Sequence, residues 1–170
     1  MNRRIYKLLL FCMVSMLSVF VHAASLQVTY HINDATETVT SGVSTEGSLA
    51  TLLGDNAMKV TQLSVIGNLN DADISLLQEM AGREEGKGSL KSLNLSEATF
   101  TETGKIVPES IFQNCKNLQH VDLSNMTEIG KWAFNNCALT EITIPASVTI
   151  IREEAFKNCS ALTTLKFEAG

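Results

Sequence analysis

A repeat with a period of 22 residues constrains the fold of this chain more than any other feature. Two columns of residues recur at that interval through the second half of the sequence. They are a phenylalanine column (Phe112, Phe134, Phe156) and a cysteine column (Cys115, Cys137, Cys159), with an asparagine before each cysteine. A unit of this length cannot bury its apolar face alone, so successive copies are expected to stack on one another.

Each cysteine is followed by apolar residues in a pattern close to L-x-x-L-x-L. The triplets are Leu118, Val121, Leu123; Leu139, Ile142, Ile144; and Leu162, Leu165, Phe167. Weaker copies occur at Leu90, Leu93, Leu95 and at Val60, Leu63, Val65, which gives five coils. The last two positions of each triplet lie on one face of a strand, and stacking aligns the strands in parallel. The sequence therefore predicts a leucine-rich repeat solenoid with a parallel β-sheet on one face, irregular or short helical backs and a small α/β N-terminal cap.

These repeats also carry a family resemblance. The segments KIVPESIFQNCKNLQHVDLS, EIGKWAFNNCALTEITIP and IPASVTIIREEAFKNCSALTTLKF resemble the BspA-like type of leucine-rich repeat. The stretch VTQLSVIGNLNDADISLLQEMAG, followed by LKSLNLS, resembles the region that often precedes such repeats. The resemblance covers residues 59 to 170. It implies a bacterial surface or secreted protein that binds host proteins or other cells, and it implies no shared catalytic residues.

The first 23 residues have the features of a signal peptide. Three basic residues precede a 14-residue apolar run from Leu8 to Val21, and Ala23 suits cleavage before Ala24. The run is shorter than the roughly 20 residues of a spanning helix, although an uncleaved anchor is the alternative interpretation. We therefore expect export to the cell surface or the extracellular space, with the periplasm as an alternative, and no membrane insertion after cleavage.

The rest of the chain divides into three regions. Residues 24–58 form the predicted N-terminal cap, with a strand over 25–31 and a short helix over 48–53. Residues 59–104 form divergent first coils with a helix over 71–81, in which Asp71 is the expected N-cap. Residues 105–170 hold three leucine-rich repeats. The last predicted coil has no polar cap after it, so we expect the repeat array to be incomplete at its C-terminus.

The charge of the mature chain excludes one class of partner. Removing residues 1 to 23 takes away three of the 13 Lys and Arg residues and none of the 18 Asp and Glu residues, which leaves a net charge of −8. Binding to nucleic acid depends on clustered cationic side chains that displace counterions from phosphates. The sequence has no such cluster, so we expect no nucleic-acid partner.

The cysteine column is the most conspicuous candidate for chemistry. Structural zinc sites use closely spaced pairs, whereas each of these cysteines lies a full coil from the next with no histidine in its column. A catalytic residue is needed once and a core residue once per turn. We therefore assign both columns to a structural core ladder, with no metal, no cofactor and no catalytic residue. A disulfide between adjacent coils remains the alternative.

The candidate binding residues alternate with the buried ones along the strands. They are His120 and Asp122, Glu141 and Thr143, and Thr164 and Lys166, all on the predicted outward face, together with Trp132, two residues before the core Phe134. The outward face of a repeat sheet commonly binds partners. A merely solvated sheet is the alternative. Trp132 is expected to be exposed as an anchor, or else to fold over Lys131 or a neighbouring coil.

These observations favour a non-enzymatic, exported protein that recognises host or bacterial surface proteins. The alternative is a truncated structural fragment or spacer of a longer repeat protein, without binding activity of its own. Self-association through the uncapped last coil is a further expectation, since that coil leaves an apolar edge and an unpaired strand. His120 and Asp122 have no nucleophile in evidence near them, so a catalytic triad is not supported.

Overall fold

The computed structural model describes residues 26–32 and 47–169, so the predicted signal peptide lies outside the described residues. Twelve elements occur in this part of the chain. They are β1 Gln27–Ile32, α2 Leu49–Leu53, the 3-10 helix η2 Gly54–Lys59, β2 Val60–Leu69, α3 Asp71–Met80, β3 Ser92–Phe100, β4 Ile106–Val107, β5 His120–Asp122, β6 Glu128–Ile129, β7 Glu141–Ile144, β8 Ile150–Ile151 and β9 Thr164–Phe167.

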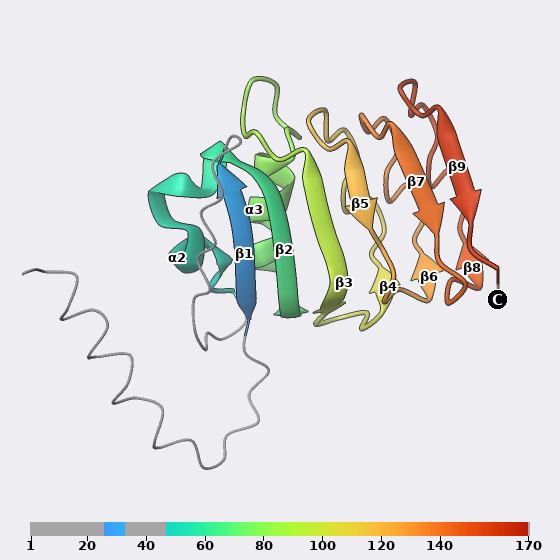
Figure 1. The fold of residues 1–170 in the computed structure, drawn as a ribbon, viewed down its shortest axis with the longest axis horizontal. Helices are drawn as coiled ribbons and strands as arrows, with labels where there is room; N and C mark the ends of the chain where they lie inside the picture. The colour runs from blue at the N-terminus through green and yellow to red at the C-terminus, as the bar shows by residue number, and fades with distance from the viewer. Residues whose placement is uncertain (1–25, 33–46, 170) are drawn as a thin grey trace, which may run out of the picture.

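The longer strands follow one another along the molecule (Figure 1). β2, β3 and β5 pair in parallel, with Leu63 opposite Leu93 and Leu93 opposite Val121, and β1 adds an antiparallel strand next to β2. β7 and β9 form a second parallel pair with Ile142 opposite Leu165. Parallel neighbours require a crossover, which α3 and the later loops provide. The predicted parallel pairing of the repeat strands is confirmed for these pairs.

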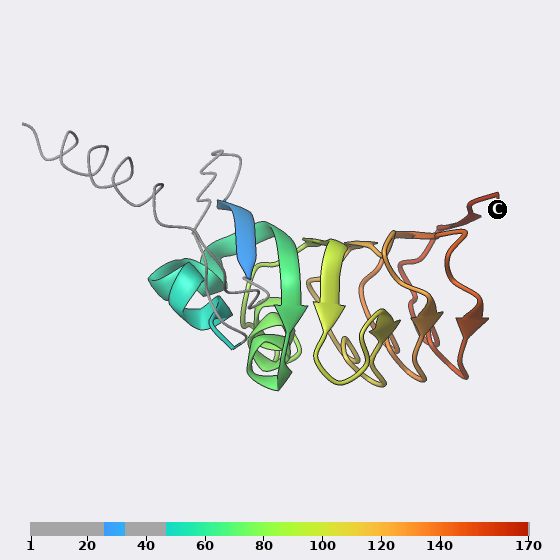
Figure 2. The ribbon, with the colours of Figure 1, turned by 90° about the horizontal axis from the view of Figure 1, so that it is seen from below.

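A second, shorter ladder runs through the coils. β4, β6 and β8 pair in parallel, with Val107 opposite Ile129 and Ile129 opposite Ile151. Figure 2, seen from below, shows the C-terminal half as successive turns of chain laid side by side. Each turn therefore contributes one long-strand segment and one two-residue strand, and both are hydrogen-bonded to neighbouring turns.

The interior of the coils is filled by the repeated side chains. Phe112 and Phe134 are buried, and their ring centroids lie 5.6 Å apart. The rings of Phe134 and Phe156 are 5.4 Å apart and nearly parallel, at 2°. These separations are close to the spacing of neighbouring strands, so the stack follows from the coil spacing. Phe156 is only half-buried, because among the described residues one coil flanks it.

The asparagine before each cysteine has a backbone explanation. Asn114, Asn136 and Asn158 have φ values of 65°, 59° and 59°. This left-handed region is unfavourable for most side chains and is tolerated best by Gly, Asn and Asp. Hydrogen bonds also join the turns of neighbouring coils. The Phe112 N–H donates to the Ala133 carbonyl and the Phe134 N–H donates to the Ala155 carbonyl, both at 2.8 Å. The asparagines therefore permit the turn that places each phenylalanine against the next coil.

The sheet is interrupted between β5 and β7, which differs from the predicted single sheet. β5 ends at Asp122, whose Oδ1 accepts a hydrogen bond from the Ser124 N–H at 2.9 Å. At the start of the two strands the Thr140 N–H donates to the Gln119 carbonyl at 3.0 Å. The ladder does not continue from there, so the four-stranded and two-stranded sheets are separate.

Helix α3 ends at Met80, within one residue of the predicted boundary, but its cap was assigned wrongly. Asn70, and not Asp71, is the N-cap, and its side chain accepts from the Ala72 and Asp73 N–H groups. Asp73 completes a capping box by accepting from the Asn70 N–H. Asp73 is also buried and accepts from the Gly47 and Leu49 N–H groups at 2.7 and 2.9 Å. It therefore ties the start of α3 to the start of α2.

The last described coil exposes several large apolar side chains. Of the six exposed large hydrophobic residues in the described part of the chain, four belong to β8 and β9. They are Ile150, Ile151, Leu165 and Phe167, with exposed fractions from 41% to 67%. Their counterparts in the preceding coils are covered by the next turn of chain. The apolar cross-section of the stack is therefore open to solvent at this end.

Candidate binding surface

The six strand residues predicted to face outward do share one face of the molecule, which we call the outward face: His120, Asp122, Glu141, Thr143, Thr164 and Lys166. Their inward neighbours Val121 and Ile142 are 8% and 2% exposed, whereas all six outward residues are half-buried or exposed. The alternation follows from the strand period of two residues. Pairing of β7 with β9 places Glu141 opposite Thr164 and Thr143 opposite Lys166.

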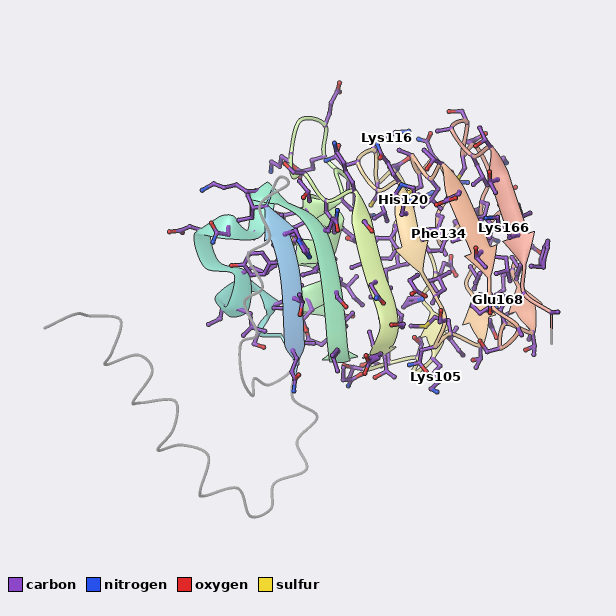
Figure 3. All side chains as sticks on the ribbon, in the orientation of Figure 1. Lys105, Lys116, His120, Phe134, Lys166 and Glu168 are labelled. Atoms are coloured by element: carbon purple, nitrogen blue, oxygen red, sulfur yellow. The ribbon has the colours of Figure 1, made fainter. Side chains whose placement is uncertain are left out.

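A hollow of about 470 Å³ lies over this face. Its lining comes from β3, β5, β7 and β9 and includes five of the six outward residues, the exception being Thr164. Glu168, directly after β9, and Ser124, after β5, also line it. Figure 3 labels His120, Lys166 and Glu168 on this side of the ribbon. Side chains from successive coils therefore meet over one depression.

Two polar contacts organise the middle of the hollow. His120 Nδ1 lies 3.3 Å from Glu141 Oε1, which links β5 to β7 where the backbone ladder is interrupted. Asp122 Oδ1 accepts from both the backbone N–H and the hydroxyl of Ser124, at 2.9 and 2.5 Å. Both His120 and Glu141 are about half exposed, so their contact adds little to stability. Asp122 thus makes a local contact with Ser124 and also lies on the outward face.

Lys166 and Glu168 contribute opposite charges at the β9 end of the hollow. Among residues 26–32 and 47–169, neither side chain has an ion-pair partner. Thr143 sits between the Asp122 and Lys166 positions and is exposed. The hollow therefore offers hydroxyls, carboxylates and one ammonium group to a partner.

The structure does not bring Trp132 to this hollow. Trp132 lies in the turn after β6, is half-buried, and has a φ of 55°. Its Nε1 donates to Glu154 Oε2 at 2.8 Å, and Lys131 Nζ lies 4.4 Å from the centroid of its ring. The hydrogen bonds from Lys157 and then from Trp132 lower the pKa of Glu154. Trp132 thus contacts Lys131 and the next coil. This agrees with the sequence interpretation in which the ring folds over Lys131 or a neighbouring coil.

The three cysteines of the described chain are free thiols in one column. The Cys137 thiol donates to the Cys115 carbonyl at 3.2 Å, and the Cys159 thiol donates to the Phe134 carbonyl at 3.0 Å. Burial raises the pKa of Cys137 to about 12, and raises the pKa of Cys115 and of Cys159 above the ordinary thiol value. A nucleophilic or metal-binding cysteine needs the thiolate, which this environment disfavours. Cys159 differs from the other two in being half-buried.

The described residues contain neither a candidate metal site nor a candidate membrane-spanning helix. No three His, Cys, Asp or Glu side chains in residues 26–32 and 47–169 are grouped so that they could hold a metal ion. Within the same residues, no helix has the length and apolar character needed to cross a membrane.

Sequence reasoning missed two parts of this surface. Glu168 lies beyond the last repeat triplet, and the hollow itself depends on how three coils meet. The turn at Asp122 did have a local signal, because an aspartate two residues before a serine can accept its backbone N–H. The same arrangement occurs one coil earlier, where Asn94 Oδ1 accepts from the Ser96 N–H at 2.8 Å.

Comparison with known proteins gives one family match. The family model described as BspA type leucine rich repeat region matches residues 86–170, in six copies. No curated protein matches the chain. A solved structure that is similar in sequence is a leucine rich cell surface protein from Faecalibacterium prausnitzii A2-165, with 32% identity and a TM-score of 0.38. That match covers 48% of this chain and 24% of the other, so the chain spans about a quarter of that protein's length.

Proposed function

Because this chain belongs to the BspA-type leucine-rich repeat family, we propose that it is a non-catalytic protein that recognises other proteins through its outward face. The observation that carries the proposal is the hollow over β3, β5, β7 and β9. It collects exposed polar side chains from several coils, which suits multipoint contact with a partner surface. The raised thiol pKa values support a structural role for the cysteine column.

The place of action is part of the proposal. The basic and apolar pattern of residues 1–23 supports export by a cleaved signal peptide. We therefore propose that residues 24–170 act at the cell surface or in the extracellular space, and that the partners are host or bacterial surface proteins. The coils from residue 59 onward form a solenoid in this account. A capping role for the N-terminal region is supported by β1, which pairs along the outer edge of β2.

A pulldown tests the outward face as the recognition surface. Tagged residues 24–170 are incubated with serum and extracellular-matrix proteins, and captured proteins are identified. Thr143→Arg places a long side chain in the hollow, so we expect it to remove most of the capture. Thr149→Arg is the matched control, because Thr149 is also exposed but does not line the hollow. Equal capture by the two variants would contradict the proposed surface.

Trp132 is tested separately in the same pulldown. Its indole N–H and one ring face are already engaged by Glu154 and Lys131. An anchor residue contributes most when a partner buries it fully, whereas this ring is held within its own chain. We therefore expect Trp132→Ala to reduce capture less than Thr143→Arg does.

A second kind of contact is favoured by the exposed residues of β8 and β9. We propose that copies of residues 24–170 associate weakly through this end, because an exposed apolar strand edge is a template for pairing with another chain. The apolar side chains that support this are Ile150, Ile151, Leu165 and Phe167. None of these four side chains lines the hollow, so the two surfaces can be separated by mutation even though β9 contributes to both.

A further inference from the structure

The hollow over the outward face has an excess of negative charge. Its lining includes three carboxylates, Asp122, Glu141 and Glu168, against the single ammonium group of Lys166. With His120 neutral, the formal net charge of the lining is −2. The carboxylates come from three successive coils, one each from β5, β7 and the residues after β9. Glu141 lies opposite Thr164 on β9, so Glu168 is four residues further along the strand direction. At about 3.3 Å per residue and about 4.8 Å between strands, the backbone positions of Glu141 and Glu168 are about 14 Å apart.

Within residues 26–32 and 47–169, these carboxylates retain oxygens that accept no hydrogen bond from another side chain or from the backbone. The contacts of Asp122 with Ser124 both go to Oδ1, and the contact of Glu141 with His120 goes to Oε1. Glu168 has no ion-pair partner in the described part of the chain. The second oxygens of Asp122 and Glu141 and both oxygens of Glu168 can therefore accept from a partner's cationic groups.

The rest of the lining argues against other partner classes. Among the described residues that line the hollow there is no Phe, Tyr or Trp, so it has no platform for stacking a sugar ring or a base. The net charge of −8 on residues 24–170 repels polyanions and attracts cationic partners from a distance. Local and long-range charge thus favour the same sign of ligand.

We propose that the hollow binds an extended segment of a partner protein that carries Lys or Arg at alternate positions. Alternate side chains of an extended segment lie on one face, about 7 Å apart, so three successive basic positions cover about 14 Å, which matches the separation of Glu141 and Glu168. Lys166 lies opposite Thr143 and two residues before Glu168, so it repels a basic group at that position and leaves the Glu141 and Glu168 positions for the partner's cationic side chains. This inference rests on the proposed function and adds the chemistry of the partner.

A peptide-binding measurement tests the charge requirement. The probe is a fluorescein-labelled (Lys-Thr)4 peptide, and its fluorescence anisotropy is followed as residues 24–170 are added at low salt. The corresponding (Glu-Thr)4 peptide is the control probe. The groove variant combines Asp122→Asn, Glu141→Gln and Glu168→Gln, and the amide introduced by Asp122→Asn keeps an oxygen that can accept from Ser124. We expect its Kd for the basic peptide to rise at least about tenfold.

A matched control variant separates local from diffuse charge. Glu85→Gln, Glu102→Gln and Glu109→Gln change the net charge by the same amount at exposed positions that do not line the hollow. We expect the Kd of this variant to stay within about twofold of the unmodified chain. Glu141→Gln with Glu168→Gln alone, which leaves the turn at Asp122 untouched, provides a second variant if the triple one is unstable.

Three outcomes overturn the inference. They are equal weakening by the groove and control variants, equal affinity for the basic and acidic peptides, and no binding of the basic peptide by the unmodified chain. A different result contradicts the proposed function: capture in the pulldown that is unchanged by Thr143→Arg. Capture that Thr143→Arg removes but the groove variant leaves intact would sustain recognition by this face and reject the basic partner.

Discussion

At the scale of single residues, Asn136 shows how one side chain serves both the turn and the stack. Its φ is 59°, and its Nδ2 donates to Asn114 Oδ1 at 2.7 Å. Lys116 Nζ in turn donates to Asn136 Oδ1 at 2.6 Å. The asparagine column therefore accommodates a left-handed backbone position and also links one coil to the previous one.

Two substitutions at Asn136 separate these contributions. Asn136→Ala loses the side-chain hydrogen bonds and places a β-carbon at positive φ, so we expect a loss of about 1–2 kcal/mol in the free energy of unfolding. Asn136→Gly loses the same hydrogen bonds but accepts the backbone conformation, so the loss is expected to be smaller. Urea unfolding of residues 24–170 measures both. A glycine variant less stable than the alanine variant would contradict the assignment of Asn136 to the positive-φ turn.

At the scale of elements, the junction between α2 and α3 depends on the buried Asp73 carboxylate. It accepts from the N–H groups of Gly47, Leu49 and Asn70. Charge-assisted hydrogen bonds of this kind are stronger than neutral ones, and their loss leaves buried donors unsatisfied. The helix pair is thus joined by a polar contact within an otherwise apolar region.

Replacing this carboxylate tests the junction. Asp73→Asn keeps the shape but turns an amide donor toward backbone donors, so we expect a loss of about 2 kcal/mol or more in the free energy of unfolding. Asp71→Asn is the control on the same helix turn, where the side chain is exposed, and it is expected to cost less than about 0.5 kcal/mol. Chemical denaturation followed by circular dichroism distinguishes them. Equal losses would show that Asp73 acts only through its helix-end charge.

At this scale, the sequence predicted the contacts that recur from coil to coil. The stacking of Phe112 on Phe134 and the pairing of Leu93 with Val121 follow from a repeat that places equivalent residues in equivalent positions. The interruption after β5 was missed because the apolar triplets continue across it, so nothing in the repeat marks the break. The Asp73 contact was missed because its partners Gly47 and Leu49 are 26 and 24 residues away. Periodicity carries no information about contacts that occur once.

For the candidate surface too, the sequence predicted the features that recur and missed those that occur once. Alternation along each strand predicts which side chains face outward, and the structure places His120, Asp122, Glu141, Thr143 and Lys166 around one hollow. The depth of the hollow and the inclusion of Glu168 depend on how neighbouring coils are set against each other. Trp132 was singled out by its residue type at a repeat position expected to be exposed. The repeat did not decide between a free anchor and a ring folded over Lys131 or a neighbouring coil, because that choice depends on pairwise contacts.

At the scale of the whole molecule, β9 exposes more apolar surface than β2, which is flanked by β1 and β3. Phe167 on β9 is 67% exposed, whereas the most exposed large apolar residue of β2 is Ile66, at 37%. We expect residues 24–170 to form concentration-dependent dimers in sedimentation equilibrium, and Phe167→Glu to shift them toward monomer. Ile66→Glu is the matched control and is expected to leave association unchanged. A chain that stays monomeric at high concentration would contradict association through this end.

The central claim is that residues recurring every 22 positions fill the interior of stacked coils. Native-state labelling of Cys115, Cys137 and Cys159 with a thiol reagent at pH 8, read out by peptide mass spectrometry, tests it most directly. The account predicts that Cys115 and Cys137 are protected until the protein unfolds, since both are buried and the pKa of Cys137 is about 12, with the half-buried Cys159 reacting first. Rapid labelling of all three thiols in the folded protein would contradict it.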